Sequence, residues 1–220
     1  MAEREDGAGN PAAGEPDARK EPWFLREPAP EPEWRELLRG ESPRAILQQI
    51  CADESLQIVE LCEHRLAEQA FLIHPDRLVA RSLARVAYAA ALGYGGDPPL
   101  AAWLTGCVDQ SIAELLSEDI EEERTGVPPE EESLRRYQEL IPAEVGIAPE
   151  LSRLTCIQFN TLPQALRIPF FRIVVTGLSI EQYALRYDRP IDEVVRQLDE
   201  ATRRLVLLVE DGKLGEEDVW

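Results

Sequence analysis

Hydrophobic side chains recur every three or four residues through the first half of the chain, which predicts helices. Ser42 and Pro43 predict the start of one helix, because a serine hydroxyl caps a helix and a proline fits its first turn. The apolar positions then indicate two short helices separated near residues 52–54, and a longer helix from about Pro75 through Ala91. This half never alternates with the period of two that a strand requires. The pattern therefore predicts an all-α fold.

A loop rich in glycine and proline, residues 93–99, is followed by a further helical pattern from Leu100 to Leu116. Beyond Leu116 the chain becomes strongly acidic, with glutamates on both sides of a glycine and two prolines. Such a composition is typical of a solvated linker. We therefore expect residues 118–150 to connect two domains, with a short helix at 133–140 that lies within the linker or docks onto a neighbour.

Three helices are expected in the second half. The first covers residues 163–176, needs a local kink at Pro169 and ends at Gly177, a residue suited to a helix C-cap. Ser179 is expected to cap a short second helix, and Asp192 a longer third helix with one apolar face. That face is formed by Val194, Val195, Leu198, Ala201 and Leu205. A short helix, a turn and a second such helix is the helix-turn-helix arrangement, in which the last helix enters the major groove of DNA.

The two ends of the chain differ from its middle in composition. Proline and glutamate dominate residues 1–33, which bury too little apolar surface to fold, so we expect residues 1–41 to form a disordered tail. The apolar residues 23–25 and Trp34 stand out within it. Two interpretations are open for them: docking onto a partner, or folding back on the body. Residues 210–220 are expected to form a second, acidic tail.

Composition narrows the function classes. The chain has 23 basic and 42 acidic residues and a formal net charge of −19, which opposes approach to a polyanion. Dispersed cysteines and histidines indicate neither a disulfide framework nor a metal site, and no cofactor is expected. We expect no enzyme, because phosphate-loop and nucleophile motifs are missing. The longest apolar run near the N-terminus is too short for a signal peptide or a span, so we expect a cytoplasmic protein without a membrane partner.

The segment LPQALRIPFFRIVVTGLSIEQYALRYDRPIDEVVRQLDEATRRL, residues 162–205, resembles region 4 of the bacterial sigma-70 family without a gap. The matching residues are Leu162, Pro163, Arg167, Gly177, Leu178, Ser179, Glu181, Ala184, Val194, Leu198, Ala201, Arg204 and Leu205. PDRLVARSLARVAYAA followed by GYGGDPPLAAWLTGCVDQSIAELL resembles region 2 of the extracytoplasmic-function sigma factors. The resemblance implies two small helical domains, a region 2-like domain at 42–117 and a region 4-like helix-turn-helix domain at 151–209, joined by the acidic linker.

A sigma factor directs transcription initiation, so the resemblance implies binding to RNA polymerase core and to promoter DNA. A regulatory protein is a third candidate partner. The candidate polymerase-binding residues are Arg77, Leu78, Arg81, Ser82 and Arg85. The candidate DNA-binding residues are Gln110, Arg189, Arg196, Gln197, Arg203 and Arg204.

The sequence departs from the family pattern on these surfaces. The helix expected to bind polymerase carries Arg77, Ala80 and Arg81 where the family usually has acidic and glutamine side chains. Asp199 and Glu200 interrupt the basic positions of the last helix, and carboxylates repel phosphates. A second hypothesis therefore stays open: a sigma-like protein-interaction module that binds polymerase or a regulator without reading DNA. The arginines of the last helix either converge into a DNA-binding stripe or form a solvated face with acidic neighbours three and four positions away.

Overall fold

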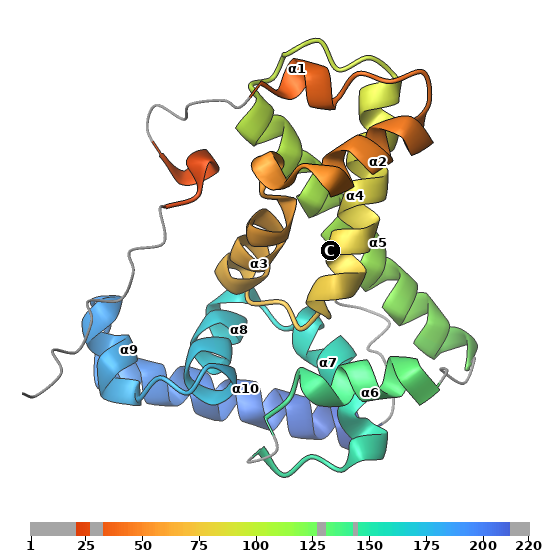
Figure 1. The fold of residues 1–220 in the computed structure, drawn as a ribbon. Helices are drawn as coiled ribbons and strands as arrows, with labels where there is room; N and C mark the ends of the chain where they lie inside the picture. The colour runs from red at the N-terminus through yellow and green to blue at the C-terminus, as the bar shows by residue number, and fades with distance from the viewer. Residues whose placement is uncertain (1–20, 27–32, 127–130, 143–144, 212–220) are drawn as a thin grey trace, which may run out of the picture.

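The computed structural model describes residues 21–26, 33–126, 131–142 and 145–211 of the 220. Within these ranges every regular element is a helix, which confirms the predicted all-α fold. The helices form two groups, one above the other in the view of Figure 1, with α3 and α4 of the first group reaching down toward α7 and α8 of the second.

The first group consists of α2 (Pro43–Ala52), α3 (Ile58–Gln69), α4 (Pro75–Ala91) and α5 (Leu100–Thr125). Their starts follow the sequence signals: the Ser42 hydroxyl accepts a hydrogen bond from the Ala45 amide at 3.3 Å, and Pro43 occupies the first turn of α2. One core lies between the four helices, and its fully buried side chains include Ile46, Leu56, Leu61, Leu78, Leu100, Leu104 and Val108.

The described part of the N-terminal segment folds back on this core. Trp23, in the short 3-10 helix η1 (Trp23–Leu25), and Trp34, in α1 (Trp34–Leu37), are both buried. The Trp34 ring lies 4.8 Å from that of Tyr94, which in turn stacks on Trp103 at 4.1 Å. Of the two interpretations, folding back is the one that the structure shows, and the predicted tail over residues 1–41 is wrong for 21–26 and 33–41. Residues 1–20 and 27–32, like 212–220, lie outside the described ranges.

The acidic stretch from residue 118 is not a free linker where the structure describes it. Residues 118–125 continue α5 to Thr125, and Asp119 is buried. The predicted short helix is confirmed as α6 (Glu131–Glu139), which packs against α7 and buries Tyr137. The composition was misleading because arginines of α4 and α7 pair with the carboxylates of α5.

The second group consists of η4 (Pro149–Leu151), α7 (Ser152–Thr161), α8 (Gln164–Phe170), the π-helical turn η5 (Phe171–Val175), α9 (Ile180–Arg186) and α10 (Ile191–Asp211). Long α10 runs beneath α8, with α9 at one end and α6 and α7 near the other (Figure 1). Its first core cluster buries Cys156, Phe159, Leu162, Ala201 and Leu205 between α7, α8 and α10.

The turn chemistry of the second group follows its sequence, with one correction. The predicted kink at Pro169 corresponds to the change from α-helix to the wider turn η5, and Gly177 has the left-handed φ of 77° expected of a C-cap. Ser179 caps α9 in a reciprocal capping box with Gln182. Asp192 does not cap α10: it lies in the first turn, and the Pro190 carbonyl before it accepts the first amide hydrogen bonds.

Two buried polar side chains join the groups. Asn160 of α7 accepts a hydrogen bond from the Leu72 amide at 2.8 Å and donates one to the Leu72 carbonyl at 3.0 Å. The Arg167 guanidinium of α8 donates to the carbonyls of Gln69, Asn160 and Leu162, and lies 3.9 Å from the centre of the Phe71 ring. Burial lowers the pKa of Arg167 to about 10, so the group still carries its charge at neutral pH. The second group thus supplies a donor to the Gln69 carbonyl in the last turn of α3, where carbonyls have no partner within the helix.

Candidate functional site

The helix expected to bind polymerase is α4. Two of its five candidate residues point into the core. Leu78 and Ser82 are fully buried in the core that α4 shares with α2, α3 and α5. Neither side chain is able to touch a polymerase subunit while these helices remain packed. This is a correction to the expected surface, and its cause is that Leu78 continues the apolar stripe of α4.

The three candidate arginines of α4 point at the neighbouring helix α5. Arg81 forms two parallel hydrogen bonds with the Glu118 carboxylate, both at 2.8 Å. Arg77 pairs with Asp119, and Arg85 pairs with Glu114. We call these three pairs the α4–α5 ladder. A bidentate arginine–carboxylate pair is the strongest geometry available to such groups, so the ladder fixes α5 beside α4.

The lower end of the ladder is tied to α6. The Tyr137 hydroxyl donates a hydrogen bond to the buried Asp119 carboxylate at 2.9 Å, next to Arg77. Burial, reinforced by the negative charge of Asp119, raises the pKa of Tyr137 to about 12. Burial by itself lowers the pKa of Arg77, but the Asp119 carboxylate outweighs it and the net shift is upward. Both donors therefore stay protonated at any physiological pH, and the cluster acts as a fixed structural joint.

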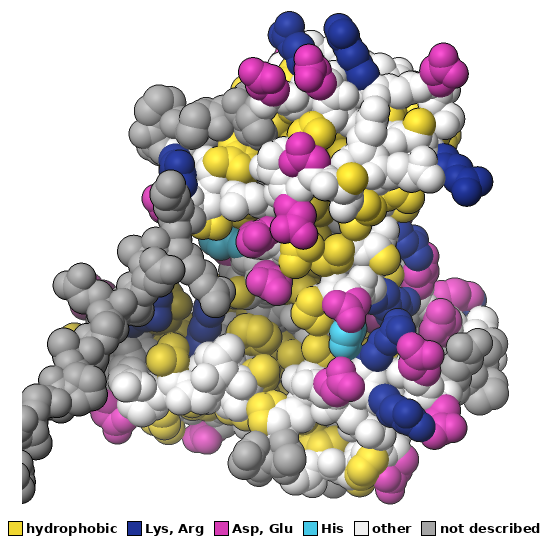
Figure 2. Space-filling view, in the orientation of Figure 1, with side chains coloured by type: hydrophobic (Ala, Val, Ile, Leu, Met, Phe, Trp, Pro, Cys, Tyr) yellow, Lys and Arg dark blue, Asp and Glu magenta, His cyan; other side chains and the backbone are white. Residues whose placement is uncertain are grey.

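Figure 2 shows the outcome on the surface: over α4, α5 and α6, basic and acidic side chains alternate, and no broad patch of a single sign appears on this face. The exposed fractions of the three arginine side chains are only 21% to 36%. A partner that approaches α4 meets charges that are already paired.

The arginines of α10 pair within their own helix. Glu200 contacts both Arg203 and Arg204, the latter at 2.7 Å. Arg196 donates to the carbonyl of Asp192, one turn earlier in the same helix. Among the described residues, Glu200 therefore interrupts the expected stripe, and the alternative that the sequence left open, a solvated face with acidic neighbours, is the arrangement found.

The remaining DNA-binding candidates do not restore a positive surface. Arg189 and Gln197 both contact Glu193, at 3.5 Å and 3.4 Å. Gln110 is exposed but lies on α5, in the other helical group. The structure thus gathers five candidates on or just before α10 and leaves the sixth on a different helix.

Exposed apolar side chains surround the turn between α9 and α10. Leu185 of α9 is 87% exposed, and Ile191 and Val195 of α10 are 49% and 37% exposed. Val194, Ala201 and Leu205 are buried as the apolar pattern predicts, whereas Val195, assigned to the same face, lies at its open edge. Sequence reasoning missed this surface, although Leu185 and Ile191 signalled it as apolar residues beside the turn.

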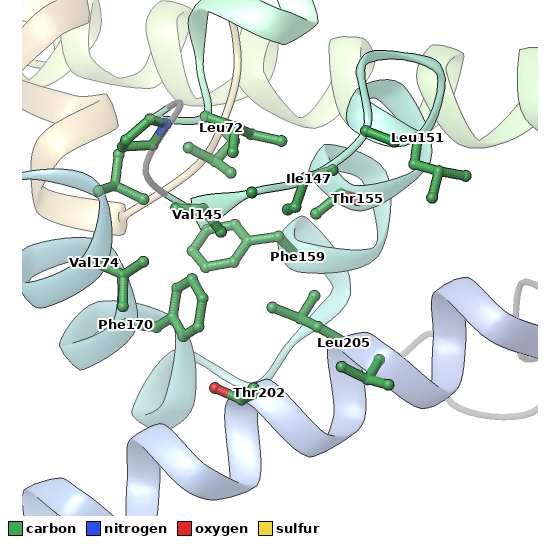
Figure 3. Close-up of a pocket in the computed structure, with 16 residues that line it drawn as sticks. Leu72, Val145, Ile147, Leu151, Thr155, Phe159, Phe170, Val174, Thr202 and Leu205 are labelled. Atoms are coloured by element: carbon green, nitrogen blue, oxygen red, sulfur yellow. The ribbon is translucent and has the colours of Figure 1, made fainter.

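An apolar pocket of about 460 Å³ lies against the second half of α10. Figure 3 shows Phe159 of α7, Phe170 of α8 and Leu205 of α10 directed into one hollow, closed on another side by Ile147. The lining contains no charged residue among those described, and Thr155 and Thr202 supply its hydroxyl groups. The volume lies within the range typical of small-ligand sites, but the sequence offered no motif that marks it.

The described residues bring together no group of three or more histidine, cysteine or acidic side chains able to hold a metal ion. Cys62, Cys107 and Cys156 are buried, and burial raises the pKa of the Cys62 thiol to about 11. A protonated thiol is a poor nucleophile. No helix in the described ranges is both long and apolar enough to cross a membrane.

No protein-family model, no curated protein and no solved structure matches the chain.

Proposed function

We propose that the chain is a sigma-like protein-interaction module that binds RNA polymerase or one of its regulators without reading promoter DNA. One observation carries the proposal: Glu200, half-buried beside the exposed face of α10, pairs with both Arg203 and Arg204. In a helix-turn-helix protein this helix supplies the contacts to DNA.

The charge balance of α10 argues in the same direction. Its exposed and half-exposed positions between 192 and 204 carry three arginines against four carboxylates, from Asp192, Glu193, Asp199 and Glu200. Affinity for DNA comes largely from cations that neutralise phosphates, and an arginine already paired with a carboxylate must first give up that pair. A net charge of −19 adds long-range repulsion.

A second candidate, a promoter-reading sigma factor of the extracytoplasmic-function kind, is favoured by the arrangement of α8, α9 and α10. Gly177, the capping box at Ser179 and the turn before α10 give a short helix followed by a long one, as in DNA-binding helix-turn-helix domains. Arg196 retains the side-chain chemistry to contact guanine.

Two measurements on the purified full chain separate the candidates. The first is a pull-down with RNA polymerase core, and the second is a mobility shift with a set of promoter fragments at low and at moderate salt. If our proposal is right, the chain retains core or a core-bound regulator in the pull-down. The chain then causes no salt-sensitive shift of DNA, whether it is tested by itself or together with core. A salt-sensitive shift of promoter fragments that exceeds the shift of a scrambled fragment would establish the promoter-reading candidate instead.

A charge-removal variant at Glu200 extends the DNA experiment, and the same change on another helix is its control. Replacing Glu200 by glutamine frees Arg203 and Arg204 at a position far from the helix ends. If carboxylates on α10 are what blocks DNA, E200Q gains weak, sequence-independent binding at low salt. The corresponding change at an equally acidic site on another helix, Glu121→Gln, leaves DNA unbound.

A further inference from the structure

α10 carries more apolar side chains than the neighbouring helices cover. Ile191, Val195, Thr202 and Val206 follow one another at spacings of four, seven and four residues, which places them on one side of a helix. The three apolar members are 37% to 49% exposed. We call these four residues the α10 stripe. At about 1.5 Å per residue it extends over roughly 22 Å, the length of a four-turn helix.

The stripe leads into the apolar pocket. Thr202 and Val206 belong to both, and Figure 3 shows Thr202 beneath the hollow that Phe170 and Leu205 enclose. Leu151, which lines another side of the pocket, is 39% exposed. The exposed apolar surface is therefore continuous from the first turn of α10 to the pocket and contains a depression able to receive a large apolar side chain.

Carboxylates border the stripe. Asp192 and Asp199, seven residues apart, lie on the same side of α10, one position after Ile191 and Leu198 respectively. In the part of the chain that the structure describes, neither side-chain carboxylate has a hydrogen-bond or ion-pair partner, in contrast with Glu193 and Glu200. Arg196 and Arg203 lie in the same row, but they contact the Asp192 carbonyl and Glu200 instead of these two carboxylates. Two unpaired carboxylates on a chain with a net charge of −19 favour a partner with the opposite charge.

We propose that the α10 stripe and the pocket form a groove that binds a cationic amphipathic helix of a partner protein. The apolar side of that helix lies along Ile191 and Val195 and inserts one large side chain among Phe170, Thr202 and Leu205. Its lysines or arginines face Asp192 and Asp199. This is the helix-in-groove mode of recognition, in which side chains at helical spacing act as anchors. The inference rests on the proposed function and specifies the chemistry of the partner.

The test uses a labelled amphipathic peptide of leucine and lysine, about 18 residues long, and measures its fluorescence anisotropy with the full chain. A peptide of the same pattern with glutamate in place of lysine is the comparison. We expect the lysine peptide to bind at least about tenfold more tightly at low salt. Ile191→Ser with Val195→Ser should weaken binding about tenfold, and Thr202→Trp, which fills the mouth of the pocket, by a similar factor. Asp192→Asn with Asp199→Asn should reduce the salt dependence.

Matched controls lie at the C-terminal end of α4, where Tyr88 and the C-cap residue Leu92 are more exposed than the stripe. Tyr88→Ser with Leu92→Ser should leave peptide binding unchanged, and circular dichroism checks that each variant keeps its helix content. If the control lowers affinity as much as the stripe variants do, the peptide binds any exposed apolar surface of the chain and the proposal is wrong. If neither set lowers affinity, the peptide recognises only the net charge of the chain, and the proposal is equally wrong.

Other occupants of the groove give different results. Sedimentation of the chain alone detects a second copy: a dimer dissolved by the stripe variants would replace our proposal. Competition by duplex DNA for the peptide would do the same, and would also overturn the proposed function. Equal binding of both peptides, with DNA still unshifted, would overturn the groove and leave the proposed function intact.

Discussion

The arginines of α4 and those of α10 both lie among acidic residues, yet they have different structural roles. Arg77, Arg81 and Arg85 reach across to a neighbouring helix, whereas Arg203 and Arg204 reach one turn back to Glu200. The first kind joins two helices and stabilises the fold. The second kind joins α10 to no other helix among the described contacts and leaves the exposed apolar edge of α10 open. An arginine in a helical pattern therefore indicates a structural or a binding role only once its partner helix is known.

The largest loss of stability is expected from removing a buried arginine that donates hydrogen bonds to other segments of the chain. Arg167→Met takes the donor from the carbonyls of Gln69, Asn160 and Leu162. Unsatisfied buried acceptors are costly, so we expect the free energy of unfolding to fall by about 3 kcal/mol in urea titrations. Arg196→Met, on the exposed face of α10, should change it by less than about 0.5 kcal/mol. Equal effects would contradict the distinction between the two kinds of arginine.

A smaller effect is expected at the lower end of the α4–α5 ladder. Asp119→Asn removes the charge opposite Arg77 and keeps an acceptor for the Tyr137 hydroxyl. Because Arg77 retains some access to water, we expect a loss of about 2 kcal/mol, below the range for a fully buried pair. Glu121→Gln is the control, since its pair with Arg124 is exposed. Thermal unfolding that is the same for both variants would show that the ladder does not hold α5.

Acid should weaken the outer part of the ladder. The hydrogen bond from Arg85 holds the pKa of Glu114 below its ordinary 4.5. A carboxyl whose pKa is lower in the folded state contributes stability above pH 4.5 and loses that contribution as pH falls through the folded value. Because the Glu114 side chain is 39% exposed, the effect is below about 1 kcal/mol. Urea titrations at pH 6 and pH 3.5 should show a larger loss for the wild type than for Glu114→Gln.

A similarly small change in stability is expected when the acidic partner on α10 is removed. Glu200→Gln breaks two exposed pairs within one helix, each worth about 0.3 to 0.5 kcal/mol at most. The free energy of unfolding should fall by less than about 1 kcal/mol, while the salt dependence of any DNA binding steepens by up to about two units as two arginines become available. A loss of several kcal/mol would show that α10 depends on this face for its structure.

Local signals along the sequence were sufficient for helix boundaries. Ser42 with Pro43, Gly177, and Ser179 with Gln182 act within one turn of the chain, so their capping roles were predictable in the second half and the first alike. Asp192 was assigned as a cap because aspartate favours that position, but Pro190 two residues earlier already starts the helix.

Long-range pairing was not predictable in the same way. Glu118 and Asp119 looked like linker residues because their arginine partners lie about forty positions earlier in the sequence. The spacing did contain a hint: Arg77, Arg81 and Arg85 recur every four residues, as do Glu114 and Glu118, so both sets form helical rows. Which row faces which depends on how α4 packs on α5, and a single sequence does not specify that. The α10 stripe escaped prediction for the same reason, since an apolar periodicity does not reveal which of its members the neighbouring helices cover.

The aromatic cluster of Trp34, Tyr94 and Trp103 has a practical consequence for the design of shorter fragments. It links α1, which precedes Ser42, to α5, so the core of the first helical group extends upstream of the boundary that composition alone suggests. A truncated fragment that begins at Ser42 would remove the Trp34 ring from its contact with Tyr94 and take two indoles out of the core. Fragments intended for crystallisation or isotope labelling should therefore retain Trp23 and Trp34.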